Sequence, residues 1–328
     1  MHYANKTLFD RAILRHTTLR NRLWRSATWL GLADTDGRVT TPIVETYRSL
    51  AAGGVGLIVT GLTSIASDDA SIGGECKFYD DSFIEGHCRL TEAVHRQGCP
   101  ILLQTALVDG PIDTLTTLQV DQLVEAFGHA AQRAEKTGYD GVQIHAAHFF
   151  YLSKFISPLF NHRADRYAGA HILPAILAAM RSHTSDDFIV TMKINCSDEF
   201  PGGLTQQGFL EACRLVEGVD AIEVSANGTS RQGIRAGANE GSFLSAATAL
   251  ATTLDVSVAL VGGLRSVDFI NQVLDNTNIS FVSLSRPLVC EPDLPNRWLQ
   301  GNAAPSRCIS CNSCYRTPGH QCVFNLKK

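Results

Sequence analysis

The chain has 328 residues, of which 45% are hydrophobic and 18% are charged, and its formal net charge at pH 7 is −4. This length and composition are typical of a globular protein with one large domain or two ordinary ones. A slightly negative chain without a dense run of Lys or Arg argues against nucleic acid as a partner. No leader pattern follows the polar start, and no apolar run approaches the ~20 residues of a membrane helix. We therefore expect a cytoplasmic protein without a membrane partner, and the sequence leaves a homo-oligomer open.

Short apolar runs rich in Val and Ile alternate with longer amphipathic stretches along the chain. Such runs are typical of parallel strands that are buried on both faces. The predicted strands cover residues 23–27, 55–60, 100–104, 141–145, 188–194, 221–225, 257–261 and 279–284. The clearest predicted helix covers residues 120–137, where apolar side chains recur at near-helical spacing and Gly138 ends the pattern. Residues 206–216 and 266–274 show the same periodicity.

Eight strands with helices between them predict an α/β fold, a (β/α)8 TIM barrel, over residues 1–299. A short cysteine-rich tail, residues 300–328, follows the barrel. A doubly wound sheet is the second candidate fold. It is less favoured because no Gly-x-Gly-x-x-Gly motif follows the first strand.

Polar residues stand at the predicted strand ends, where a barrel of this kind keeps its chemistry. His145 and His148 end the fourth strand, and Gln104 ends the third. Two imidazoles three residues apart can hold one carbonyl or anionic group, although ordinary hydrogen-bonded histidines would explain such a pair in isolation. Lys193 lies within the apolar fifth strand. Because a lone buried ammonium is costly, it should meet either a ligand anion or a protein carboxylate.

The seventh and eighth strands end in a pattern that is typical of phosphate binding. Gly262 and Gly263 follow the seventh strand, and Ser285 and Arg286 follow the eighth. Barrels often bind phosphate between these two loops, because glycines free backbone N–H groups and an Arg offers a bidentate partner. We therefore expect a phosphorylated ligand at the barrel mouth.

Several segments form a recognisable set in this order along nearly the whole barrel: residues 21–28, 51–61, 141–158, 161–169 and 193–195, with Gly262-Gly263 and Arg286-Pro287. Together they resemble the Old Yellow Enzyme family of FMN-dependent NAD(P)H oxidoreductases and ene-reductases, especially its branch near 2,4-dienoyl-CoA and 2-enoate reductases.

The resemblance implies FMN at the barrel mouth, NAD(P)H as the reductant and a small conjugated carbonyl compound as the substrate. Lys193 would lie near the flavin N1/O2 edge, and His145 and His148 would hold the substrate carbonyl oxygen. The remaining flavin-binding positions implied by the resemblance are Ala27, Thr28, Gly61, Gln104, Gly262, Gly263, Ser285 and Arg286.

Two departures from the family pattern affect the expected substrate side. The family usually places a proton-donating Tyr two residues after the second histidine, but this chain has Phe150 there, followed by Tyr151. We expect Tyr151, another acid or water to supply that proton. The family's His-Ala-Gly-Arg after the third strand is also replaced, by Thr105-Ala-Leu-Val at the same place.

Four cysteines crowd the tail at short spacing: Cys308, Cys311, Cys314 and Cys322. Such spacing is a strong signal for metal, whereas disulfides are disfavoured in a reducing compartment. The tail resembles the [4Fe–4S] segment of larger members of the branch, in which the cluster passes electrons from a further flavin and nicotinamide module. A [4Fe–4S] cluster or a structural zinc ion therefore both fit, and a separate electron-donor protein is a candidate partner.

The leading hypothesis is an FMN-dependent oxidoreductase whose reduced flavin passes hydride to an activated C=C bond. The first alternative is a flavin-binding accessory or electron-transfer protein without this activity, which Phe150 motivates. The second is a flavin-free barrel in which Lys193 forms a Schiff base.

Overall fold

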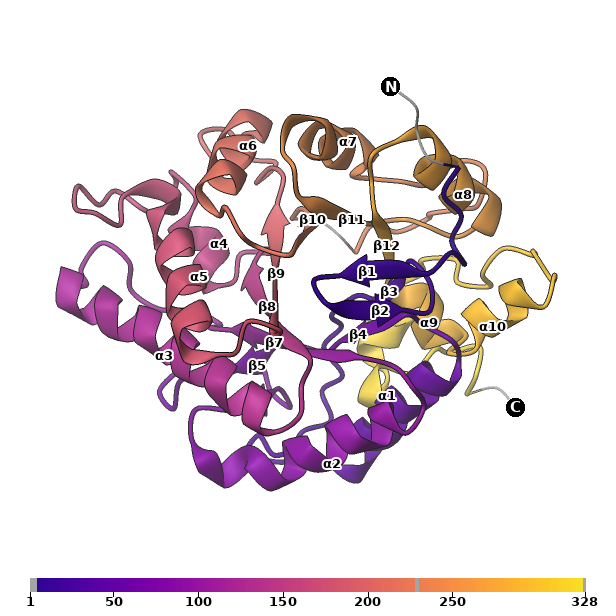
Figure 1. The fold of residues 1–328 in the computed structure, drawn as a ribbon, viewed down its shortest axis with the longest axis horizontal. Helices are drawn as coiled ribbons and strands as arrows, with labels where there is room; N and C mark the ends of the chain where they lie inside the picture. The colour runs from indigo at the N-terminus through magenta and orange to yellow at the C-terminus, as the bar shows by residue number, and fades with distance from the viewer. Residues whose placement is uncertain (1–4, 228–229, 327–328) are drawn as a thin grey trace.

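The computed structural model describes residues 5–227 and 230–326, and its centre is a closed barrel of parallel strands (Figure 1). The barrel strands are β3 (Leu23–Arg25), β4 (Leu57–Val59), β7 (Ile101–Ala106), β8 (Gly141–Ala146), β9 (Ile189–Asn195), β10 (Ala221–Ser225), β11 (Ser257–Val261) and β12 (Phe281–Leu284). Each pairs in parallel with its neighbours, and the pairings β12–β3, β3–β4 and β4–β7 close the ring. The predicted (β/α)8 barrel is confirmed, and closure of the ring excludes the doubly wound sheet.

Helices form a ring around the strands (Figure 1). They are α1 (Thr41–Ala52), α2 (Ile84–His95), α3 (Thr117–Lys136), α5 (Ile172–His183), α6 (Gln206–Leu215), α7 (Leu244–Thr253) and α8 (Val267–Asn276), with the short α4 (Tyr151–Phe155), α9 (Arg286–Cys290) and α10 (Leu294–Leu299). The three predicted helices correspond to α3, α6 and α8. Helix α3 begins earlier than predicted because Thr116 and Gln119 form a capping box.

A hairpin of β1 (Ala12–Leu14) and β2 (Thr17–Leu19) precedes the barrel and was not predicted. Its side chains Ala12, Leu14 and Leu19 are buried in one cluster with residues from the first halves of the barrel strands, such as Ile189 and Ala221. The hairpin therefore closes the amino-terminal end of the barrel and leaves the carboxyl-terminal end open for a ligand. The short strands β5 (Thr63–Ser64) and β6 (Cys76–Lys77) extend the sheet beside β7 and were also not predicted.

The tail runs back over the barrel rim after α10, and over residues 300–326 its only helical elements are the short 3-10 turns Ser313–Arg316 and Pro318–His320. The Ser306 N–H donates to the Arg265 carbonyl oxygen (2.8 Å), and Arg265 Nε donates to the Cys308 carbonyl oxygen (3.0 Å). These bonds attach the tail to the loop that follows β11. None of the helices described in residues 5–227 and 230–326 is long and apolar enough to cross a membrane. Residues 1–4, part of the polar start considered above, lie outside the described residues.

Candidate active site

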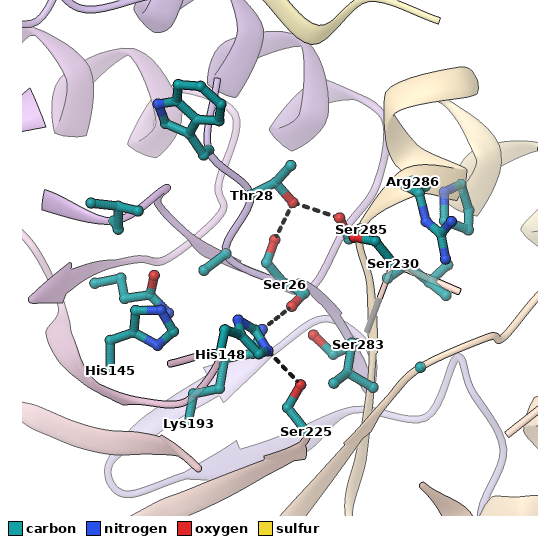
Figure 2. Close-up of a pocket in the computed structure, with 18 of the residues that line it drawn as sticks. Ser26, Thr28, His145, His148, Lys193, Ser225, Ser230, Ser283, Ser285 and Arg286 are labelled. Carbon is teal, nitrogen blue, oxygen red and sulfur yellow. Dashed lines mark hydrogen bonds between the residues drawn. The ribbon is translucent and has the colours of Figure 1, made fainter. Parts of the chain in front are cut away.

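A cavity of about 300 Å³ opens at the carboxyl-terminal ends of the barrel strands. Its walls bring together most of the residues that the sequence singled out: Ala27, Thr28, Gln104, His145, His148, Lys193, Gly262, Gly263, Ser285 and Arg286. Figure 2 shows His145 and Arg286 on opposite sides of this cavity, with Lys193 and His148 below and between them. The cavity is of a size that suits a small-molecule ligand or cofactor.

The two histidines form one edge of the cavity, with ring centroids 5.3 Å apart. His148 Nε2 shares a hydrogen bond of 2.8 Å with the Ser225 hydroxyl group, and the backbone N–H of His148 donates to Asn195 Oδ1 (3.1 Å). His148 and Phe149 both have positive φ angles, 64° and 59°. Because non-glycine residues rarely adopt this conformation, the surrounding contacts hold a strained turn that aims His148 into the cavity.

Both imidazoles are neutral at physiological pH. Burial, and secondly the nearby Lys193 charge, lower the pKa of His145 to about 3. The same two causes, with a smaller effect of His145, hold the pKa of His148 well below its usual range. The buried Nδ1 atom of His145 has no hydrogen-bond partner within the described protein. A buried polar atom without a partner is costly, so the His145 ring is suited to a ligand that can pair with it.

A chain of buried polar side chains forms the floor of the cavity. Lys193 Nζ donates to Ser26 Oγ (2.8 Å) and lies 3.6 Å from Glu223 Oε1. Glu223 accepts hydrogen bonds from Ser26 Oγ (2.7 Å) and Gln143 Nε2 (3.0 Å), and Gln143 Oε1 accepts from Gln104 Nε2 (2.9 Å). Burial lowers the pKa of Lys193, and Glu223 opposes that effect. Lys193 therefore both meets a protein carboxylate and lines the ligand cavity.

Gln143 and Glu223 belong to this floor but were missed in the sequence analysis. Each lies two residues before a polar cavity residue on the same strand, Gln143 before His145 and Glu223 before Ser225. Because side chains two apart in a strand share a face, this alternation within two apolar strands could have revealed them.

The opposite end of the cavity is positively charged and glycine-rich. Buried Arg265 and Arg286 both line it, beside Gly262 and Gly263. The two glycines have φ angles of 109° and 77°, and a Cβ on Gly262 would lie 2.7 Å from the Phe243 ring. Only glycine fits there, and its bare backbone leaves room for close approach of an anion. Beside them, the Ser285 and Thr28 hydroxyl groups share a hydrogen bond of 2.8 Å.

Two predicted site residues do not line this cavity. The Gly61 N–H donates to the Tyr47 hydroxyl oxygen (2.6 Å), and Gly61 lines a small adjoining cavity with Trp29. Tyr151 is buried, and its hydroxyl group donates to the Pro111 carbonyl oxygen (2.7 Å). Phe150 lines the cavity instead, with its ring centroid 4.9 Å from that of His145. The Tyr151 hydroxyl group is therefore directed away from the place where the sequence led us to expect a proton donor.

The four tail cysteines line one small cavity together with Arg286, which also lines the large cavity. All four are free thiols in the structure. Among the described residues, Glu125, His129 and His183 are the only group of three potential metal-binding residues whose ligand atoms all lie within 4.8 Å of one another. Within the described part of the chain, therefore, no three of the tail thiols lie within 4.8 Å of one another.

The sequence matches the family model of the NADH:flavin oxidoreductase / NADH oxidase family over residues 7–114 and 111–304. The chain belongs to this family. A metal reductase of Desulforamulus reducens is 30% identical over 93% of the chain, and a cinnamate reductase of Clostridium sporogenes is 26% identical over 86%. The chain spans about half of each of these relatives, 50% and 51% of their length.

The solved structure of the old yellow enzyme homologue from Zymomonas mobilis has the same fold, with a TM-score of 0.76. It is 20% identical to the chain, and the alignment covers 92% of this chain and 95% of that one. The family resemblance inferred from the sequence is confirmed. The expected class, flavin-dependent oxidoreductases, is confirmed at the level of the family.

Proposed function

We propose that the chain binds FMN in the barrel-mouth cavity and reduces the activated C=C bond of an enone- or enoate-type substrate, with NAD(P)H as the source of electrons. The single observation that carries this proposal is the arrangement around one cavity of two neutral imidazoles, the buried His145 and the half-buried His148, and the buried Lys193. The relative named cinnamate reductase supports this substrate class.

The residues present fit FMN. The positively charged end formed by Arg265, Arg286, Gly262 and Gly263 would hold the phosphate group, with Ser285 and Thr28 beside it. Lys193 would face the pyrimidine edge, where a fixed positive charge stabilises negative charge on the ring. Gln104 would hydrogen-bond to the same edge, while Ala27, which lines the cavity, would leave room for the flat ring system. Bound FMN supplies hydride chemistry.

The neutral histidines are suited to polarising a substrate carbonyl group. A neutral imidazole donates one hydrogen bond, and His145 has an unpaired Nδ1 atom in a buried position. Two such donors aimed at one oxygen would stabilise the negative charge that develops there during reduction of the conjugated double bond. The apolar wall formed by Phe150, Leu62 and Ile72 would exclude water from a flat substrate.

The proton for the substrate carbon comes from water in this proposal. A phenyl ring cannot donate a proton, and the Tyr151 hydroxyl group is bonded to Pro111. Phe150 at the expected donor position also favours a second candidate function, a flavin-binding electron-transfer protein without ene-reductase activity, because such a protein needs no proton donor.

For the tail, residues 300–328, we propose a [4Fe–4S] cluster held by Cys308, Cys311, Cys314 and Cys322. The four cysteines line one small cavity, and their short spacing along the chain is typical of a cluster-binding segment. Arg286 lines both cavities, so the tail cavity adjoins the positively charged end of the barrel cavity. Electrons from a separate donor protein could then enter the barrel, residues 1–299, through the tail.

Ten free thiols support a reducing, cytoplasmic location. The homo-oligomer stays a prediction.

The test is a visible absorption spectrum of protein purified without oxygen, followed by addition of NADH, NADPH and a cyclic enone. Flavin bands that bleach with a nicotinamide and return with the enone would support the proposed reaction. About four irons per chain would support the cluster, whereas zinc or no metal would exclude it. Flavin that is reduced only by a low-potential donor and never reoxidised by the enone would favour the electron-transfer alternative. Absence of flavin after incubation with FMN would overturn both.

A further inference from the structure

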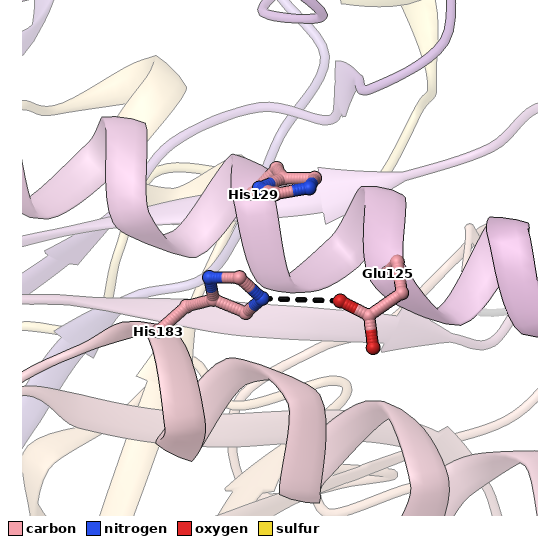
Figure 3. A group of neighbouring side chains, drawn as sticks. All are labelled: Glu125, His129 and His183. Carbon is pink, nitrogen blue, oxygen red and sulfur yellow. Dashed lines mark hydrogen bonds and ion pairs between the residues drawn. The ribbon is translucent and has the colours of Figure 1, made fainter.

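Two helices on the outside of the barrel bring three potential metal ligands together, away from the barrel mouth and the tail. Glu125 and His129 lie one turn apart on α3, and His183 is the last residue of α5 (Figure 3). His183 Nε2 lies 3.1 Å from Glu125 Oε2, and the His129 and His183 ring centroids are 4.7 Å apart. One ligand atom from each residue falls within 4.8 Å of the other two.

A glycine makes this close approach of the two helices sterically feasible. Gly128 lies in α3 between the two ligand positions, and a Cβ there would lie 2.6 Å from His183 Cδ2 and 3.1 Å from the Ala179 carbonyl oxygen. The segment that follows α5 is also held against α3, because the Ser185 N–H donates to Glu135 Oε1 of α3 (3.1 Å). The backbone therefore holds His183 against α3, and only side-chain rotation is needed to bring the three ligand atoms closer.

Two imidazoles and a carboxylate form one of the ligand sets that zinc uses when its fourth position is left open to water. Bonds of about 2.0–2.2 Å in a tetrahedral site place neighbouring ligand atoms roughly 3.3–3.6 Å apart. The Glu125–His183 pair, at 3.1 Å, is within a few tenths of an ångström of this spacing. Residues four apart on a helix face the same side, so His129 needs only to turn its ring toward the pair.

We propose that Glu125, His129 and His183 bind one Zn²⁺ ion, with water in the fourth position, and that the ion clamps α3 to α5. The site is separate from the proposed FMN and iron–sulfur sites, because none of its three residues lines either cavity. Zinc bound only to the folded state raises the stability of that state by mass action.

The chain offers a matched control for this site. His95 and Asp140 form another partly exposed histidine–carboxylate pair, with Nε2 and Oδ2 2.8 Å apart, but this pair is not part of a three-ligand group among the described residues. Two ligands bind zinc more weakly than three, so His95→Gln should leave the proposed site intact.

The experiment is an isothermal calorimetric titration of zinc chloride into the whole chain, which keeps whatever flavin and tail metal it carries after purification. Wild type, Glu125→Gln, His129→Gln, His183→Gln and His95→Gln are compared. Any zinc that the tail thiols take is a common background. We expect the affinity for one equivalent of zinc to fall at least about 100-fold in the three site variants but not in His95→Gln. Even substitutions of residues that only contact metal ligands alter metal affinity about 10–100-fold.

Three further measurements separate loss of the zinc site from loss of folding. Melting temperature without zinc and flavin content show whether each variant folds, and neither should depend on the three ligands beyond ordinary surface effects. Crystals soaked in zinc should give an anomalous peak between α3 and α5 in wild type. Equal zinc stoichiometry and affinity in wild type and in folded His183→Gln, or no anomalous peak at this position, would overturn the proposal.

Discussion

Lys193 Nζ lies 3.6 Å from Glu223 Oε1 on the cavity floor, and the Ser26 hydroxyl group hydrogen-bonds to both side chains. The two residues pair in register on the adjacent strands β9 and β10, and both are buried. The carboxylate thus offsets the cost of burying an ammonium beneath the cavity, and this charge is available to a ligand above it.

The first prediction concerns this buried pair. Glu223→Gln keeps a side chain that can bond to Ser26 and Gln143, but it leaves the buried charge of Lys193 uncompensated. Loss of one partner of a buried ion pair typically costs about 3–5 kcal/mol, whereas replacing both is often nearly neutral. We expect Glu223→Gln and Lys193→Met each to lower the free energy of unfolding of the flavin-free protein, and the double variant to regain much of that loss. Urea denaturation measures all four proteins, and additive losses would contradict a coupled pair.

The second prediction concerns the histidines as hydrogen-bond donors to substrate. His145→Ala and His148→Ala should each lower the rate at which an enone reoxidises the reduced flavin, by about 10²–10³-fold, the usual effect of removing one such donor. Flavin content should stay near that of wild type, because neither side chain is part of the predicted phosphate or pyrimidine contacts. Stopped-flow reoxidation checks the rate. Normal rates in both variants would show that the carbonyl oxygen is held elsewhere.

The third prediction concerns acid sensitivity. Burial, with a smaller effect of Lys193, lowers the pKa of His145 to about 3 in the folded protein, whereas an unfolded histidine has a pKa of about 6.5. Between these values the unfolded chain binds a proton that the folded chain does not, so stability falls as pH decreases from about 6.5 toward 3. His145→Gln should remove about 1.4 kcal/mol per pH unit from that slope. Urea denaturation at pH 6.5, 5.5 and 4.5 checks it, and parallel curves for the two proteins would refute it.

The sequence predicted the barrel well because each strand is a short apolar run buried on both faces. It did not predict the β1–β2 hairpin, whose strands are three residues long and carry too few positions to show a pattern. The sequence alone also could not predict which residues far apart in the chain come into contact. Gln143 and Glu223 are separated by 80 residues, and Glu125 and His183 by 58. Such contacts depend on register around the closed barrel and on how closely two helices pack.

Phe150 lines the cavity and Tyr151 does not, although the sequence led us to consider Tyr151 as the proton donor. This difference has a local cause in the backbone that the sequence does not reveal. Consecutive positive φ angles at His148 and Phe149 turn the chain sharply before α4 begins. This turn leaves Phe150 on the cavity wall and directs the Tyr151 hydroxyl group to Pro111. The residue two positions after the second histidine therefore lines the cavity, but its side chain lacks a hydroxyl group.

The last prediction uses that placement. Phe150→Tyr adds a hydroxyl group to a ring that already lines the cavity, 4.9 Å from the His145 ring. General-acid catalysis by a positioned side chain contributes about 10²–10⁴-fold, so substrate protonation should accelerate until another step limits the reaction. Because another step then limits the reaction, we expect a smaller net gain, a single-turnover reduction of a cyclic enone that is at least about tenfold faster. Tyr151→Phe is the control. It loses the bond to Pro111, worth about 1 kcal/mol of stability, and should leave this rate unchanged. A slower reaction in Tyr151→Phe, with no gain in Phe150→Tyr, would instead make Tyr151 the proton donor through a rearranged α4.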